Sequence, residues 1–177
     1  MARSEIRIAG TGGQGIVTAG QILAEAAVLS GRNATHSQAY GPQSRGGACR
    51  SDVVIATGEI GFPLASDIDV LVVLSGPAYT RYRPELGDDG ILVVDSRCAP
   101  VPLAGAKQFP IVDTARAVFG NRVLIGVVAL GLLQGLTGVV DADALRRAVA
   151  AGAPAAYRLT NLAALSAGME LVDGRAA

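Results

Sequence analysis

Residues Glu5 to Gly15 read EIRIAGTGGQG and give the clearest indication of the fold. In its first half isoleucines alternate with an arginine, and this alternation predicts a short strand over residues 5–9. A glycine-rich turn follows, after which apolar residues at helical spacing predict a helix over residues 16–30 that ends before Gly31. A strand, a glycine turn and a helix in this order are typical of an α/β fold.

Strands and helices alternate along the rest of the chain. The predicted strands cover residues 33–37, 52–56, 69–74 and 91–94, with a further short strand at Ile111 and Val112 after Pro110. The predicted helices cover residues 77–86, 113–119, 123–136, 141–150 and 154–172, with Asp141 as an N-cap, and residues 40–50 are predicted to form a loop. Because the β-branched runs are continuous, we expect a parallel sheet that is covered on both faces. The predicted fold is a single domain over residues 1–177, a three-layer α/β/α sandwich with a mostly parallel Rossmann-like sheet and a helical C-terminal part.

The amino-acid composition excludes several classes of protein function. The 177 residues carry 15 basic and 15 acidic side chains, and this balance argues against a dedicated nucleic-acid-binding protein, which needs a basic face. Two cysteines exclude a disulfide scaffold and cannot by themselves hold a tetrahedral zinc or an iron–sulfur cluster. The most apolar stretch, Val123 to Leu136, is shorter than the ~20 residues that cross a bilayer. We therefore expect a buried helix there, and a soluble, cytoplasmic protein without a secretory signal.

The glycine turn has the pattern of a phosphate-binding loop. Gly10, Gly12 and Gly15 form Gly-x-Gly-x-x-Gly between a strand and a helix, where backbone amides and the helix N-terminus attract an anion. No carboxylate within residues 33–37 can hold a ribose, and no Lys-Ser/Thr pair follows Gly15. Neither a dinucleotide site nor a nucleoside-triphosphate site is therefore predicted. Phosphate binding and a tightly packed turn without a ligand both stay open on these residues alone.

A second polar segment, Tyr40 to Gly47, reads YGPQSRGG. Its Arg45 stands beside two glycines, and an arginine in this setting can bind a phosphate or a carboxylate through two parallel hydrogen bonds. The alternative is an ordered loop in which the arginine ties down backbone carbonyl groups.

Taken together, these segments resemble the gamma subunit of the 2-oxoacid:ferredoxin (acceptor) oxidoreductases, and the resemblance covers nearly the whole chain. Residues 10–15 resemble the family's Gly-x-Gly-Gly-Gln-Gly signature. Residues 40–47 resemble its Tyr-Gly-Pro-Glu-x-Arg-Gly-Gly segment, with Gln43 where glutamate is expected. Further matches lie at residues 66–71, 121–126 and 161–168. Five matches in the same order are far more specific than any one of them.

The resemblance implies a subunit that is inactive alone. The holoenzymes of this family oxidatively decarboxylate a 2-oxoacid to an acyl-CoA and pass the electrons to ferredoxin or a similar carrier. The Tyr-Gly-Pro form of the second segment favours pyruvate or 2-oxoglutarate over indolepyruvate. In the family, thiamine diphosphate lies between the alpha and beta subunits and iron–sulfur clusters lie in beta or delta. The resemblance thus implies that this chain serves assembly and lies on the CoA side of the complex. Its expected partners are the alpha and beta subunits, with delta as a third candidate. In the absence of these partners, the chain is considered as a homodimer.

The resemblance also implies the site residues. The expected contacts with the CoA phosphates or the CoA channel are Gly10, Gly12, Gly13, Gln14 and Gly15. The expected contacts at a subunit interface are Tyr40, Pro42, Gln43 and Arg45, since aromatic and arginine side chains are frequent in interface hot spots. We expect no catalytic residue and no metal ligand in this chain, and a structural role for His36 and for the thiol of Cys49.

Two other functions stay open from the sequence. One is a free-standing nucleotide- or flavin-binding redox protein, although aromatic residues make up only 4% of the chain and few could stack on a flavin. The other is a purely structural assembly module, which differs from a CoA-side subunit only in that its glycine turn binds nothing.

Overall fold

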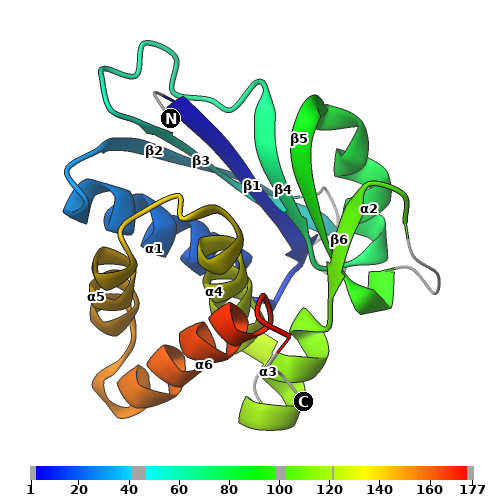
Figure 1. The fold of residues 1–177 in the computed structure, drawn as a ribbon, viewed down its shortest axis with the longest axis vertical. Helices are drawn as coiled ribbons and strands as arrows, with labels where there is room; N and C mark the ends of the chain where they lie inside the picture. The colour runs from blue at the N-terminus through cyan, green and yellow to red at the C-terminus, as the bar shows by residue number, and fades with distance from the viewer. Residues whose placement is uncertain (1–2, 41–46, 99–102, 121, 175–177) are drawn as a thin grey trace.

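Six strands form one sheet within the described residues. The structure is a computed structural model that describes residues 3–40, 47–98, 103–120 and 122–174. The strands are β1 (Arg3–Thr11), β2 (Asn33–Tyr40), β3 (Ala48–Ala56), β4 (Ile68–Val73), β5 (Leu86–Asp95) and β6 (Ala106–Phe109). They lie in the order β2-β3-β1-β4-β5-β6 (Figure 1). β1, β4, β5 and β6 run parallel, whereas β3 pairs antiparallel with β1 and with β2. The prediction of a mostly parallel sheet is confirmed, and the antiparallel strand β3 with its neighbour β2 is added at one side.

Helices lie on both faces of the sheet in unequal numbers (Figure 1). They are α1 (Ile16–Leu29), α2 (Gly76–Tyr82), α3 (Ile111–Phe119), α4 (Ile125–Thr137), α5 (Ala142–Gly152) and α6 (Arg158–Glu170). The main apolar core joins α1 and α3–α6 to one face of the sheet, which presents Ile6, Ile8 and Val72. On the other face, a smaller cluster packs α2 against Leu71 and Val73. These layers agree with the predicted three-layer sandwich and its helical C-terminal part.

The apolar stretch predicted as a buried helix is α4, and α6 packs directly against it. A Cβ atom at Gly131 of α4 would lie 2.0 Å from the carbonyl oxygen of Leu165, and one at Gly168 of α6 would lie 2.0 Å from that of Val128. Only glycine lets the two backbones approach so closely. Among the described residues, no helix is both long and apolar enough to span a membrane.

One predicted strand is wrong. Ile111 and Val112 begin helix α3, and the last strand, β6, lies just before them. Pro110 occupies the N-cap position of α3, and the buried carboxylate of Asp95 accepts a hydrogen bond of 2.8 Å from the backbone N–H of Val112. The first turn of α3 is therefore capped from the end of β5, a tertiary contact that the local sequence does not reveal.

The other differences from the prediction are shifts of boundaries. β3 and β5 begin several residues earlier than predicted, and the predicted loop is shorter because Tyr40 ends β2 and Ala48 begins β3. Asp141 is the N-cap of α5 as predicted, since its carboxylate accepts a hydrogen bond of 2.8 Å from the N–H of Ala144. Gly31, after α1, has the positive φ of 74° expected of a glycine at a helix end.

Candidate functional site

The carboxyl ends of β1 and β4 form a topological switch point of the sheet. From β1 the chain passes into α1 on one face, and from β4 it passes into α2 on the other. The N–H of Leu74, just after β4, donates to the carbonyl of Ala9 on β1 at 2.8 Å, so the two strands stay joined up to this edge. Ligands of open α/β sheets bind at the carboxyl edge beside such a point. The glycine turn, residues 10–15, lies there.

Gln14 connects the elements around the glycine turn through its buried side chain. Its Oε1 accepts a hydrogen bond of 2.7 Å from the N–H of Thr11, and its Nε2 donates one of 3.0 Å to the carbonyl of Leu74. The carbonyl of Gln14 itself accepts a hydrogen bond of 2.9 Å from the N–H of Gly126 in α4. The polar atoms of this side chain are thus occupied within the protein, and Gln14 joins the ends of β1 and β4 to the start of α4.

Two glycines of the turn are required by close packing. A Cβ at Gly10 would lie 2.3 Å from Oε1 of Gln14 and 2.6 Å from Cδ1 of Ile16. Gly15 has a φ of 72°, and a Cβ there would lie 2.2 Å from the carbonyl oxygen of Val123. Larger residues at these positions would displace backbone or a buried side chain.

Gly12 and Gly13 differ from these two glycines because they face open space. A Cβ at either position would meet no atom of the described residues within 4 Å, although Gly13 has a positive φ of 87°. Both residues are exposed at the N-terminal end of α1. The first turn of α1 holds no acidic residue, and the N-cap position, Gly15, offers no side chain to its amides. Neither the first turn of α1 nor its N-cap therefore compensates the partial positive charge of this helix end, and an anion can approach the backbone at Gly12 and Gly13.

Tyr40 lies at the same edge of the sheet as the glycine turn. In the antiparallel ladder, Tyr40 of β2 pairs with Cys49 of β3, which in turn pairs with Gly10 of β1. The side chain of Tyr40 is 66% exposed and belongs to no apolar cluster of the described residues. The fold thus brings Tyr40, the first residue of the second motif, to the edge that carries the glycine turn. The predicted interface residues Pro42, Gln43 and Arg45 lie outside the described residues.

An ion-pair cluster that the sequence did not predict lies under α2. The guanidinium of Arg7, which is 1% exposed, donates hydrogen bonds of 2.7 and 2.9 Å to the two carboxylate oxygens of Asp52. Glu85 contacts both Arg7 and Arg50, and both guanidiniums lie over the ring of Tyr82, at 5.4 and 5.6 Å from its centroid. This cluster fixes β1 to β3 and to the end of α2, below the switch point.

Cys49 is buried, whereas Cys98 and the imidazole of His36 are half-buried. Cys49 packs in the main core, whereas Cys98 packs in the cluster on the other face of the sheet. Burial raises the pKa of Cys98 to about 12 and also raises the pKa of Cys49, so both thiols stay protonated at neutral pH. Nε2 of His36 lies 2.7 Å from Oγ of Ser51. Within the described ranges, no three His, Cys, Asp or Glu side chains come together to hold a metal ion.

Comparison with known proteins assigns this architecture to a family. Residues 5–171 match the family described as pyruvate ferredoxin/flavodoxin oxidoreductase, and the chain belongs to it. Within the family, it is similar to the 2-oxoglutarate synthase subunit KorC of Methanothermobacter thermautotrophicus. The two are 37% identical over 180 residues, which cover 96% of this chain and 95% of the relative. The family resemblance that the sequence motifs predicted is confirmed.

Solved structures agree with this assignment. The gamma subunit of a keto/oxoacid ferredoxin oxidoreductase from Geobacter sulfurreducens superposes with a TM-score of 0.87 at 37% identity, over 99% of both chains. A 2-oxoglutarate:ferredoxin oxidoreductase from Magnetococcus marinus, solved with 2-oxoglutarate, coenzyme A and succinyl-CoA bound, superposes with a TM-score of 0.79. That match covers 99% of this chain and 31% of the longer one, and at 19% identity it shows the fold alone.

Proposed function

We propose that this chain is the gamma subunit of a multisubunit 2-oxoglutarate:ferredoxin (acceptor) oxidoreductase. The observation that carries the proposal is its similarity, over almost the full length of both chains, to a 2-oxoglutarate synthase subunit. The complex would convert 2-oxoglutarate and CoA to succinyl-CoA and CO₂ and pass two electrons to ferredoxin or a similar carrier in the cytoplasm. Other 2-oxoacids, pyruvate first among them, are the alternatives that the assay must separate.

The chemistry of decarboxylation and electron transfer belongs to partner subunits in this proposal. An iron–sulfur cluster needs several thiolates, whereas Cys49 and Cys98 pack on opposite faces of the sheet with raised pKa values. The residues of this chain therefore do not fit a cluster. We assign thiamine diphosphate and the clusters to the alpha and beta subunits, or to a delta subunit, and assembly and the CoA side to this chain.

Within this chain, the exposed pair Gly12 and Gly13 is the proposed contact with CoA. Their open backbone and the N-terminus of α1, whose first turn holds no acidic residue, suit a phosphate group. Gly10, Gln14 and Gly15 support this contact by holding the turn in shape. Tyr40, at the same edge, is part of the proposed subunit contact, to which the sequence motif adds Pro42, Gln43 and Arg45.

Reconstitution of the complex tests the function. The chain is co-expressed with its candidate partner subunits, and acceptor reduction by the purified complex is followed with 2-oxoglutarate, pyruvate and indolepyruvate. We expect CoA-dependent reduction with 2-oxoglutarate as the preferred substrate and no activity from this chain alone. A monomer that reduces the acceptor by itself, or a complex with a different preferred 2-oxoacid, would contradict the assignment.

A further inference from the structure

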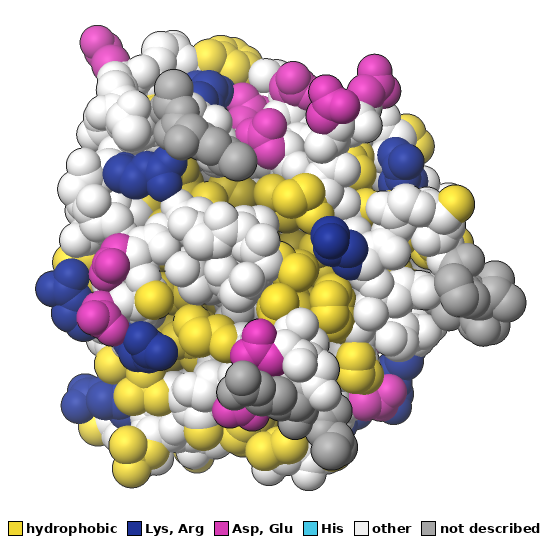
Figure 2. Space-filling model, viewed as in Figure 1, with side chains coloured by type: hydrophobic (Ala, Val, Ile, Leu, Met, Phe, Trp, Pro, Cys, Tyr) yellow, Lys and Arg dark blue, Asp and Glu magenta, His cyan; other side chains and the backbone are white. Residues whose placement is uncertain are grey.

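A groove lies at the end of the molecule opposite the glycine turn, where the parallel strands begin. It encloses a cavity of about 730 Å³ between the starts of β1, β4 and β5 and the C-terminal end of α4. Figure 2 shows hydrophobic side chains lining a hollow down the centre of this face, with acidic side chains gathered along its upper rim. None of the residues of the glycine turn lines this cavity. The groove is thus separate from the proposed CoA contact.

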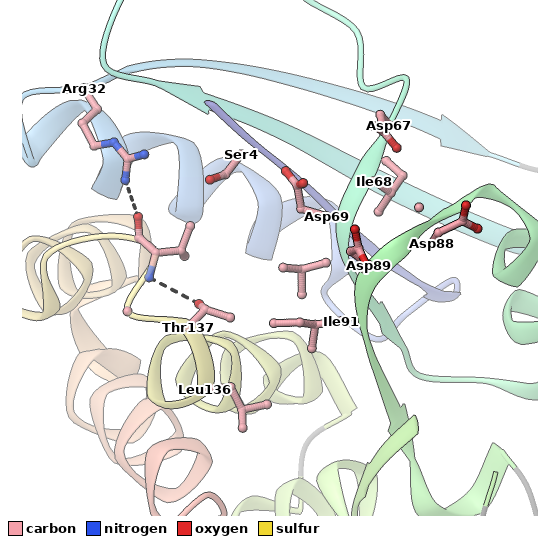
Figure 3. A pocket seen from close by; sticks show the side chains of 15 residues that line it. Ser4, Arg32, Asp67, Ile68, Asp69, Asp88, Asp89, Ile91, Leu136 and Thr137 are labelled. Carbon is pink, nitrogen blue, oxygen red and sulfur yellow. Dashed lines mark hydrogen bonds between the residues drawn. The ribbon is translucent and has the colours of Figure 1, made fainter. Parts of the chain in front are cut away.

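The floor of the groove is apolar and only partly covered. Ile91 of β5 and Leu136 of α4 are half-buried there, and both pack against the edge of the main core. Figure 3 shows Ile91 on the β5 side and Leu136 on the α4 side of the cavity. Apolar surface in a concave site is a common feature of surfaces that another molecule covers.

The rim on the strand side carries an excess of negative charge. Four aspartates line it: Asp67, Asp69, Asp88 and Asp89 (Figure 3). Asp69 is fixed by the N–H of Glu5, which donates to its carboxylate at 2.7 Å. Asp88 and Asp89 are exposed, and neither makes an ion pair or a side-chain hydrogen bond with the described residues. The C-terminal end of α4 adds the negative end of a helix dipole to the same cavity.

Among the described residues that line the groove, Arg32 is the one cation, and it lies at the opposite end. Arg32 lines the cavity and donates a hydrogen bond of 2.6 Å to the carbonyl of Val139 (Figure 3). Its charge disfavours a second cation at that end. A positively charged group in the groove is therefore directed toward Asp88 and Asp89, whose carboxylates have no partner among the described residues.

We infer that this groove receives a lysine or arginine side chain from another subunit of the oxidoreductase. The aliphatic stem lies on Ile91 and Leu136, and the charged end pairs with Asp88 and Asp89. Long basic side chains match such a site because they bury their methylene groups while keeping the charge at the rim. The inference rests on the proposed function only in naming a subunit of that complex as the partner. A second copy of this chain and a free polyamine are the competing occupants.

Charge reversal on the rim tests the inference. The dissociation constant of this chain from the rest of its complex is measured for the wild type, for Asp88→Lys/Asp89→Lys and for Asp88→Asn/Asp89→Asn. A Glu25→Lys/Asp143→Lys variant makes the same change of charge on the exposed faces of α1 and α5. We expect the dissociation constant to rise at least about tenfold for the lysine variant at low salt, less for the asparagine variant, and to stay within about twofold for the control.

A photo-crosslinking residue placed at position 89 identifies the occupant. We expect a crosslink to a peptide of a partner subunit that contains lysine or arginine. Three results would overturn the inference. The dissociation constants could be equal for all variants, or the crosslink could form only to a second copy of this chain. The third is that spermidine abolishes the crosslink while the complex stays intact. A wild-type chain that binds no partner subunit at all would instead overturn the proposed function.

Discussion

The side-chain amide of Gln14 and the backbone carbonyl of Leu74 are joined by a hydrogen bond of 3.0 Å that ties the end of β1 to the end of β4. The same side chain holds the N–H of Thr11 through its oxygen. Because both contacts lie at the switch point of the sheet, this one residue shapes the edge at which we place the CoA contact.

Replacement of Gln14 by alanine should destabilise the protein. The carbonyl of Leu74 would lose its partner in a buried setting and the N–H of Thr11 in a half-buried one, at a cost of about 1–3 kcal/mol. Urea unfolding measures the change, and Gln21→Ala on the exposed face of α1 is the control. Equal stability of the two variants would show that the two hydrogen bonds contribute nothing.

Removal of the charge of Asp52 should lower the free energy of unfolding by more than the replacement of Gln14 does. The Asp52→Asn variant leaves the guanidinium of Arg7 buried with an incomplete partner, and such a change costs about 3–5 kcal/mol. Asp143→Asn breaks an exposed ion pair with Arg146 and should cost less than about 1 kcal/mol. Chemical denaturation of both variants makes the comparison, and similar losses would contradict the buried network.

A methyl group at Gly131 should weaken the packing of α4 against α6. In the Gly131→Ala variant the new Cβ would overlap the carbonyl of Leu165, so the helices must separate, at a cost of about 1–3 kcal/mol or more. Gly58→Ala, where a Cβ meets open space, is the matched control. A thermal midpoint for Gly131→Ala as high as that of the control would refute the close contact.

The stability of the fold should depend on the protonation of its only histidine. Burial lowers the pKa of His36 below its ordinary 6.5, and the charge of Asp52 opposes this shift only in part. The unfolded chain therefore binds a proton more readily than the folded one, and the free energy of unfolding should increase as pH rises from below the lowered pKa to above 6.5. Above pH 6.5 the free energy of unfolding should no longer change with the protonation of His36.

His36→Gln isolates this effect, because the amide can still hydrogen-bond to Ser51 but does not titrate. Urea unfolding of both proteins between about pH 5 and about pH 8 gives the two curves. The variant should show a smaller increase over this range. An identical slope for both proteins, or a wild type that loses stability as pH rises, would contradict the assignment.

Much of the fold follows from local patterns in the sequence. The strand before Gly10, the helix after Gly15 and the cap at Asp141 are visible because alternation, helical spacing and capping residues act over a few positions. The misassigned segment at Ile111 shows the limit of such patterns. Its helix is capped by Asp95, sixteen positions earlier, and only the folded sheet brings that carboxylate to it.

The location of the candidate site was predictable from the sequence, but which of its glycines are packed and which are open was not. The motif marks residues 10–15 as one unit, whereas the structure separates the packed positions Gly10 and Gly15 from the open ones, Gly12 and Gly13. The ion pair of Arg7 with Asp52 was likewise hidden, because it depends on the antiparallel register of β1 and β3. That register brings together residues that lie 45 positions apart.

We propose that the open part of the glycine turn faces CoA in the assembled oxidoreductase, and a matched pair of variants at Gly12 tests this contact. Gly12 has room for a side chain, so Gly12→Asn and Gly12→Asp should both fold and differ only in charge. The KM for CoA is measured in the reconstituted complex with 2-oxoglutarate saturating. We expect Gly12→Asp to raise this KM at least about tenfold over Gly12→Asn, which corresponds to about 1.4 kcal/mol of repulsion from a phosphate. Equal KM values for the two variants and the wild type would contradict the claim.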